Sequence, residues 1–157
     1  MTTIELIPPD PRHRPAGAPR ALLYPLWVFA LEIRPRLRRT PRTLVFSVDG
    51  LRAVPMPIPR IPDVISQVVP PEHRILEGIP EALALGNTRQ VVKKALGLLG
   101  TLSSDIRVVE RRKVYKLYWL LPDTGRGEVL VDSRSGSEVP MARSRPGSEP
   151  RPEDPRT

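Results

Sequence analysis

Arginines are the residues of this chain best suited to bind a charged partner. Five of them lie within nine residues, in the segment Arg34-Pro-Arg-Leu-Arg-Arg-Thr-Pro-Arg42. A guanidinium group donates paired hydrogen bonds to a phosphate or a carboxylate, so this cluster suits a nucleic acid or an acidic protein face. Pro35 and Pro41 oppose regular strand pairing, which predicts a stiff, exposed loop. A solvated loop that only blocks edge-to-edge pairing of strands explains the same charges equally well.

A second, shorter basic run lies later in the chain and adds two arginines to this set. The candidate partner-binding residues are Arg34, Arg36, Arg38, Arg39, Arg42, Arg111 and Arg112. The whole chain carries 25 Lys and Arg against 17 Asp and Glu, a formal net charge of +8. Such a charge attracts nucleic acids and acidic proteins. A genome rich in G and C, which favours Arg, Pro, Ala and Leu codons, produces the same composition without any partner.

Other kinds of chemistry have little support in the sequence. The absence of Cys excludes disulfides, thiolate zinc sites, iron–sulfur clusters and cysteine nucleophiles. Two histidines, His13 and His73, are too few for a histidine-rich metal site. No GxxxxGK[ST], GxGxxG, HExxH or GxSxG motif occurs. We therefore expect a protein that is not an enzyme and that holds no cofactor and no metal.

Two aspartates end β-branched runs and form the remaining candidate pair. Asp49 precedes Gly50, and Asp132 precedes the polar segment Ser133–Gly136. A shared catalytic or metal-binding role is one interpretation. A structural role is the interpretation we favour, because an Asp carboxylate accepts hydrogen bonds from the backbone N–H groups that follow it in a turn.

Two predicted β-hairpins position these residues. The first covers residues 20–50, and the second covers residues 105–132. In the second hairpin the alternating residues Tyr115, Leu117, Trp119 and Leu121 suit one buried face of a strand. Both hairpins show the same order of features: a Tyr-x-Leu-aromatic segment, a turn, a β-branched run that ends in Val-Asp, and then Val-Pro-Met. This order predicts an imperfect internal repeat.

A connector and a helix are expected between the hairpins. The connector, residues 51–86, is rich in proline, with a short helical turn predicted from Asp63 to Val69. A helix is predicted over residues 87–102, with Asn87 as its cap and Gly100 near its end. Its apolar stripe, expected to pack on the sheet, consists of Val91, Ala95, Leu98, Leu99 and Leu102.

Both ends of the chain are predicted to be disordered tails, residues 1–19 and 142–157. Proline and charged residues dominate them, and they offer little apolar surface whose burial would offset the entropy of ordering. The foldable part is a single domain over residues 20–141. We predict the α+β class, with an antiparallel sheet made of two related β-hairpins and one main helix packed on it.

The same residues resemble the PepSY-like modules, small α+β units in which one helix lies on an antiparallel hairpin. The matching residues of the first copy are Tyr24-Pro25-Leu26-Trp27 and Val48-Asp49-Gly50, and those of the second are Tyr115, Tyr118-Trp119 and Val131-Asp132. The second copy, residues 87–139, matches the whole unit, whereas the first has no obvious helix before it. The resemblance implies a non-catalytic binding or inhibitory module.

The expected function is that of a small, non-enzymatic protein that binds another protein through its sheet surface or its basic loop. The alternative is a nucleic-acid-associated protein that uses the Arg34–Arg42 loop with Arg111 and Arg112. The first residues lack the basic and apolar regions of a secretory signal. The longest apolar stretch, residues 21–31, is too short to span a bilayer. We therefore expect no membrane span and a cytoplasmic location, and the oligomeric state stays open.

Overall fold

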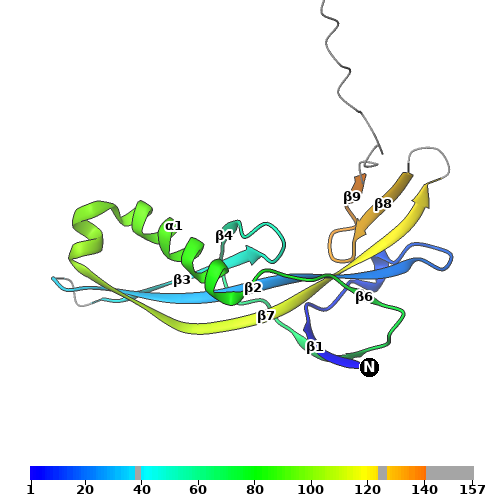
Figure 1. The fold of residues 1–157 in the computed structure, drawn as a ribbon, viewed down its shortest axis with the longest axis horizontal. Coiled ribbons are helices and arrows are strands. Elements are labelled where there is room, and N and C mark those ends of the chain that lie inside the picture. Colours follow the sequence, from blue (N-terminus) through cyan, green and yellow to red (C-terminus); the bar gives the residue numbers. More distant parts are fainter. Residues whose placement is uncertain (38–39, 124–126, 141–157) are drawn as a thin grey trace, which may run out of the picture.

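The computed structural model describes residues 1–37, 40–123 and 127–140 of the chain (Figure 1). Two of the candidate arginines, Arg38 and Arg39, lie outside these residues. The predicted C-terminal tail at 142–157 lies outside them as well.

Nine β-strands and one α-helix make up most of the described part of the chain. The strands are β1 (Thr2–Leu6), β2 (Arg20–Pro35), β3 (Arg42–Asp49), β4 (Pro55–Ile58), β5 (Ile65–Val69), β6 (Arg74–Ile75), β7 (Ser104–Asp123), β8 (Gly127–Asp132) and β9 (Glu138–Pro140). The helix is α1 (Glu81–Leu102), and a short 3-10 helix, η1, covers Pro11–His13. The strands form one sheet in the order β4-β3-β2-β7-β1-β5, with β6 paired to β2, and β8 and β9 continuing from β7.

A long antiparallel ribbon of β2 and β7 forms the centre of this sheet. Its pairing runs from Arg20 opposite Leu120 to Pro35 opposite Ser104. Both strands extend along most of the length of the molecule (Figure 1). The register shifts at a bulge between Ala30 and Leu31, and such an extra residue bends a strand and increases its twist.

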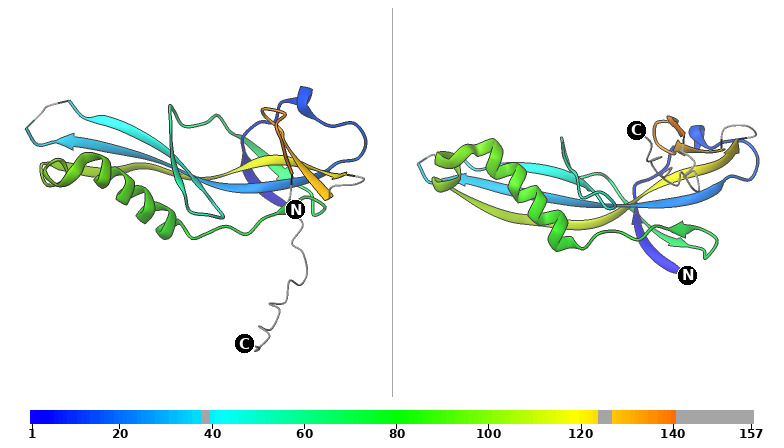
Figure 2. Two further views of the ribbon diagram at one scale, coloured as in Figure 1. Left: turned by 90° about the horizontal axis from the view of Figure 1, so that it is seen from above. Right: turned by 45° about the horizontal axis from the view of Figure 1, so that its top comes forward.

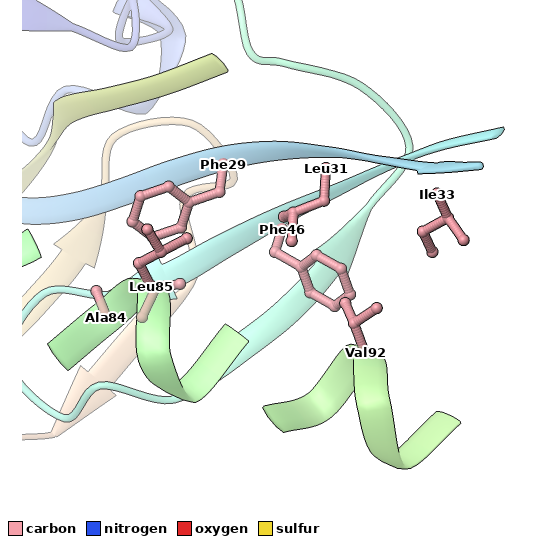
Figure 3. Packing of buried hydrophobic residues seen from close by; sticks show 8 residues of the cluster. Phe29, Leu31, Ile33, Phe46, Ala84, Leu85 and Val92 are labelled. Atoms are coloured by element: carbon pink, nitrogen blue, oxygen red, sulfur yellow. The ribbon is translucent and has the colours of Figure 1, made fainter. Parts of the chain in front are cut away.

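Helix α1 covers one face of the hairpin formed by β2 and β3. The cluster between them is shown in Figure 3 and consists of Phe29, Leu31, Ile33, Phe46, Val48, Ala84, Leu85 and Val92. On a strand, alternate residues point to the same face, so Phe29, Leu31 and Ile33 together meet the helix. Complete burial of one large aliphatic or aromatic side chain contributes about 1.5–3 kcal/mol. This cluster therefore anchors α1 on the sheet.

A second cluster lies near the other end of the ribbon. It consists of Ile4, Leu6, Ala21, Leu23, Val69 and Leu117, with Ile75, Tyr115 and Trp119 packed against it. The N-terminal strand supplies two of these residues, Ile4 and Leu6. The two clusters divide the ribbon into a helix-covered half and a half covered by short strands and η1.

The predicted fold class is wrong. The chain is mainly β, and among the described residues the nine-stranded sheet is mixed, because β1 runs parallel to β7 and β6 runs parallel to β2. The strands β1, β5 and β6 have only two to five residues each, and each pairs with a strand far away along the chain. Such short segments give little local indication of a strand.

The prediction of a disordered N-terminal tail over residues 1–19 does not hold in the structure. Strand β1 pairs antiparallel with β5 over five residues, from Thr2 opposite Val69 to Leu6 opposite Ile65. The same pairing overturns the predicted helical turn from Asp63 to Val69, because Ile65–Val69 is a strand. Alternation in the first residues places Ile4 and Leu6 on the buried face, and this provides the apolar surface that residues 8–19 lack.

The predicted end of the helix at residue 102 is confirmed, but its predicted start and its predicted buried residues are wrong. Helix α1 begins at Glu81 after Pro80, so Asn87 is not its cap; the Asn87 side-chain amide instead donates to the carbonyl of Ala53 at 2.9 Å. The residues of α1 that are buried are Ala84, Leu85, Thr88 and Val92. The members of the predicted stripe, Val91, Ala95, Leu98, Leu99 and Leu102, are instead all exposed.

Candidate functional site

The second half of α1 carries the most exposed large apolar residues of the helix. Leu98, Leu99 and Leu102 are 76%, 81% and 64% exposed. Gly97 has φ 71° and ψ 177°, which breaks the helix just before them. A positive φ of this kind is readily adopted only by glycine. The break separates these leucines from the turns of α1 that pack on the sheet.

The end of α1 meets the tip of the hairpin formed by β2 and β3. The backbone N–H of Arg36 donates to the carbonyl of Ser103 at 2.8 Å. Leu37, the next residue, is 93% exposed. The end of β2, the start of β3 and the end of α1 therefore lie at the same end of the molecule in Figures 1 and 2. We call the four residues Leu37, Leu98, Leu99 and Leu102 the tip leucines.

Basic residues lie on the strands and the helix that meet at this end of the molecule. Arg34 and Arg107 lie 3.1 and 3.8 Å from the carboxylate of Glu32, and Arg36 lies 3.4 Å from that of Asp105. Three arginines thus share two carboxylates. Arg42, Lys93 and Lys94 have no carboxylate within 4.0 Å in the part of the chain that the structure describes. The tip therefore combines apolar surface with an excess of positive charge.

The remaining candidate arginines do not join this surface. Arg111 donates to Glu81 at 2.9 Å and ties the start of α1 to β7. Arg112 pairs with Glu110 on its own strand at 2.6 Å. Consecutive residues of a strand point to opposite faces of the sheet. The structure therefore does not bring the predicted set together, and only Arg34, Arg36 and Arg42 of its described members lie at the tip.

The two aspartates hold matching turns, as the structural interpretation predicts. The Oδ1 atom of Asp49 accepts hydrogen bonds from the backbone N–H groups of Leu51 and Arg52 at 2.9 and 3.0 Å. The Oδ1 atom of Asp132 accepts those of Arg134 and Ser135 at 2.8 and 3.4 Å. In each turn the carbonyl of the aspartate also accepts the N–H of the residue four positions later, which has a positive φ.

Side chains from the central ribbon complete both aspartate sites. The hydroxyl of Tyr24 donates to Asp49 at 2.6 Å, and the ammonium of Lys116 lies 2.6 Å from Asp132. Burial opposes ionisation of Asp49, but the Tyr24 and backbone hydrogen bonds outweigh it and hold the pKa of Asp49 below its usual value. Burial likewise opposes ionisation of Asp132, and Lys116 with the turn N–H groups lowers its pKa.

Tyr24 and Lys116 face each other across the ribbon, so the two sites lie close to one another on β2 and β7. Burial, followed by the hydrogen bond to Asp49, raises the pKa of Tyr24 above its ordinary value. The hydrogen bond from Tyr24 to Asp49 and the ion pair of Lys116 with Asp132 thus connect the turns after β3 and β8 to the central ribbon.

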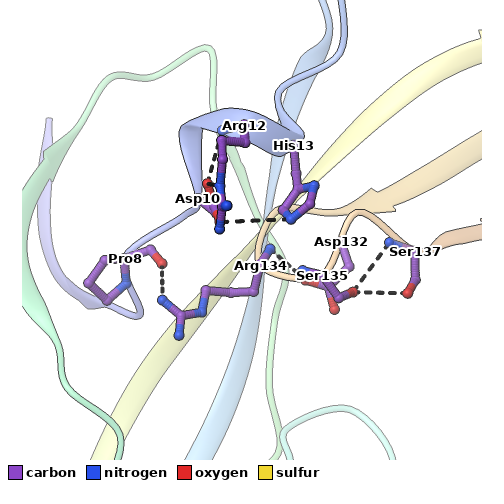
Figure 4. A network of polar contacts seen from close by, with 8 residues as sticks. All are labelled: Pro8, Asp10, Arg12, His13, Asp132, Arg134, Ser135 and Ser137. Atoms are coloured by element: carbon purple, nitrogen blue, oxygen red, sulfur yellow. Dashed lines mark hydrogen bonds and ion pairs between the residues drawn. The ribbon is translucent and has the colours of Figure 1, made fainter.

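The N-terminal segment is fastened to the Asp132 turn. The guanidinium of Arg134 donates to the carbonyl of Pro8 at 3.0 Å, and the N–H of Asp10 donates to the carbonyl of Ser133 at 2.9 Å. Figure 4 shows the side chains of this region, where Asp10 also binds the Arg12 side chain at 2.7 Å. These contacts account for the order of residues 8–13 despite their prolines.

The described residues form neither a metal-binding cluster nor a membrane-spanning helix. Among the residues that the structure describes, no three or more His, Asp or Glu side chains group closely enough to hold a metal ion. Within that part of the chain, no helix combines the length and the hydrophobicity that crossing a bilayer requires.

No family model, curated protein or solved structure matches this chain. The resemblance to PepSY-like modules therefore stays a prediction. The sequence pattern did not indicate that Leu37, Lys93 and Lys94 belong to the exposed surface at the tip. It predicted that Leu98, Leu99 and Leu102 pack on the sheet. The signal that could have separated them is Gly97, because a glycine inside an apolar helical pattern marks a place where the backbone can turn.

Proposed function

We propose that this chain is a non-enzymatic binding protein. The end of the molecule that carries the tip leucines binds an acidic, partly apolar surface of another protein. The observation that carries the proposal is the exposure of the tip leucines, together with the cations Arg42, Lys93 and Lys94 of the adjoining strand β3 and helix α1. Large aliphatic side chains gathered at one exposed place are characteristic of interaction sites. The cations of the adjoining strand and helix favour a partner with negative charge.

The free energy available at the tip is consistent with a specific contact. Each tip leucine is more than 60% exposed, and complete burial of a leucine contributes about 1.5–3 kcal/mol. Part of this gain is lost to the entropy of association. Two or three leucines in a well-packed pocket are nevertheless a usual size for the group of residues that dominates an interface.

A nucleic acid is the second candidate, supported by the Arg34–Arg42 segment. Two observations favour a protein over it. The leucines gain little from a phosphate backbone, whereas an apolar pocket on a protein buries them. Arg34 and Arg36 already contact the carboxylates of Glu32 and Asp105, so binding phosphates would require these contacts to be exchanged.

The test is affinity capture from nuclease-treated lysate with the tagged full chain, quantified by mass spectrometry. We compare the native chain with the double variant Leu98→Glu/Leu99→Glu. The matched control is Val68→Glu on β5, which is 50% exposed and lies at the opposite edge of the sheet. All three positions are exposed, so the variants should keep the fold, which circular dichroism and thermal unfolding check.

The expected result is a set of proteins captured by the native chain and by Val68→Glu. Capture should fall at least about tenfold with Leu98→Glu/Leu99→Glu, since central apolar contacts dominate interfaces. Equal capture by the native chain and the double variant would overturn the tip as the binding surface. Loss of all captured proteins on nuclease treatment, together with nucleic acid in the untreated sample, would replace the proposal by the nucleic-acid alternative.

A further inference from the structure

Two segments of the chain approach the central ribbon in the same way. The N–H of Ile79 donates to the carbonyl of Gly50 at 2.6 Å, and the N–H of Asp10 donates to that of Ser133 at 2.9 Å. Gly50 and Ser133 directly follow the two turn aspartates. In each segment the next residue is a proline that leads into a helix.

The helices that follow differ greatly in length. Ile79 leads into α1, of 22 residues, whereas Asp10 leads into η1, of three residues. The hairpin of β2 and β3 is therefore covered by a long helix. The hairpin of β7 and β8 lacks an equivalent cover among the described residues.

The two tryptophans show the consequence of this difference. Trp27 lies opposite Val48, and Trp119 lies opposite Val131, the residue before the turn aspartate in both cases. The indole N–H of Trp27 donates to the carbonyl of Ile79 at 3.0 Å. The buried indole nitrogen of Trp119 has no acceptor in the described part of the chain. The surroundings of Trp119 are thus less complete than those of Trp27.

A half-open pocket of about 350 Å³ lies beside Trp119. Its apolar wall includes Leu6, Leu23, Leu117 and Trp119, which belong to the second cluster or pack against it. This volume is within the range of small-molecule sites, which are typically apolar with a few polar groups that orient the ligand. The pocket is therefore large enough for a ligand with an apolar body.

The polar groups of the pocket favour an anionic head. Arg14 lies over the ring of Trp119, 5.1 Å from its centroid, and has no carboxylate within 4.0 Å among the described residues. His73 and Gln67 add hydrogen-bond donors to the lining. Asp10, the acidic residue of the lining, binds Arg12 through both carboxylate oxygens, which compensates its charge.

We propose that this pocket binds a small amphiphilic carboxylate. The carboxylate accepts hydrogen bonds from Arg14 and His73, and the alkyl or aryl body packs on Leu23, Leu117 and Trp119. This site lies apart from the tip leucines and does not depend on the function proposed for them. A charge-assisted contact with Arg14 provides the selectivity for an anion.

The probe is octanoate, and the reporter is Trp119 itself. In the full chain carrying Trp27→Phe, Trp119 is the remaining tryptophan, so its fluorescence reports on the pocket. We expect a saturable change with an affinity on the order of 0.1 mM. Acetate, which lacks the tail, octan-1-ol, which lacks the charge, and octylamine, which reverses it, should each bind at least about tenfold more weakly.

Two variants of β5 test whether octanoate binds in this pocket. Gln67→Trp adds a ring on the pocket side of β5, and Ser66→Trp adds the same ring on the opposite face of the same strand, because neighbouring strand residues alternate. Since each adds a tryptophan, octanoate binding is measured by isothermal titration calorimetry. Gln67→Trp should abolish binding, and Ser66→Trp should leave it within about twofold of the native chain.

Arg14→Gln tests the anionic head, and Arg14 is exposed, so the fold does not depend on it. Affinity for octanoate should fall about tenfold, with little change for octan-1-ol. Absence of a saturable change with octanoate at millimolar concentrations would overturn the proposal. Equal binding of octan-1-ol or octylamine would overturn the anionic head, and binding that survives Gln67→Trp would overturn the location.

Discussion

At the scale of single residues, the two turn aspartates explain how the ends of β3 and β8 are fixed. Asp49 and Asp132 each accept hydrogen bonds from two backbone N–H groups of the following turn, and each carboxylate also binds a side chain of the ribbon. The preference of Asp for such turns is local chemistry. The sequence therefore predicts these residues and their role correctly, and it does not reveal Tyr24 and Lys116 as their partners.

The lowered pKa values of both aspartates predict how stability depends on pH. A carboxyl group whose pKa is lower in the folded state stabilises the fold at pH values above its unfolded pKa, near 3.9. This contribution is lost as the pH falls through the folded pKa. Asp132→Asn should lower the free energy of unfolding by about 1–2 kcal/mol at pH 7 and reduce the further loss on acidification to pH 3.

Urea unfolding of the native chain and of Asp132→Asn at both pH values measures this effect. Asp63→Asn is the control, because Asp63 and its partner Arg60 are both largely exposed and 3.8 Å apart. Such surface pairs contribute little to stability. A native stability that is the same at pH 3 and pH 7 would contradict the role of the aspartates.

At the scale of elements, α1 shows why a correct helix can be assigned to the wrong face. The period of its apolar residues identifies a helix, and residues 87–102 do lie within α1. The buried residues of α1, such as Ala84 and Val92, come before Gly97, whereas Leu98, Leu99 and Leu102 come after it and are exposed. In an unbroken helix Ala84 and Leu102 would lie on the same face. Periodicity assumes an unbroken helix, so it does not reveal that the backbone changes direction at Gly97.

The break at Gly97 provides a test at this scale. Gly97→Ala places a side chain at φ 71°, which costs about 1–3 kcal/mol if the break is kept. Gly86→Ala is the matched control, since Gly86 lies in the same helix, does not have a positive φ and has open space around its Cα. That control should stabilise the chain by about 0.5–1 kcal/mol.

Thermal and urea unfolding of both variants measure these changes. The same sign of effect for the two glycines would contradict a special backbone at Gly97. Gly97→Ala should also weaken capture of the proteins that depend on Leu98 and Leu99, because the break sets the direction of these side chains.

At the scale of the whole molecule, the sheet depends on contacts between distant parts of the chain. Strand β2 is readily recognised by its long, nearly continuous apolar run, and β7 by the alternation of apolar residues in its second half. The strands β1, β5 and β6 are not, because each is short and gains its stability from a partner far away in the sequence. This explains why a sequence-based assignment finds the long hairpins and misses the mixed sheet.

Removal of residues 1–7 tests the structural role assigned to the N-terminus. The deletion takes Ile4 and Leu6 from the second cluster and leaves β5 without its partner strand. The free energy of unfolding should fall by roughly 3–6 kcal/mol, from the loss of two buried aliphatic side chains. Thr3→Ala, at an exposed position of the same strand, should change it by less than about 0.5 kcal/mol. Unchanged stability of the shortened chain would show that β1 does not hold the sheet together.

Site-specific photo-crosslinking from position 99 tests most directly whether the tip contacts a protein. A photoreactive phenylalanine derivative replaces Leu99 in one sample and Val68 of β5 in another, and both are irradiated in cell lysate. The proposed function predicts an adduct from position 99 that protease removes and nuclease leaves intact, with no such adduct from position 68. An adduct from position 68 alone, or one from position 99 that nuclease removes, would contradict it.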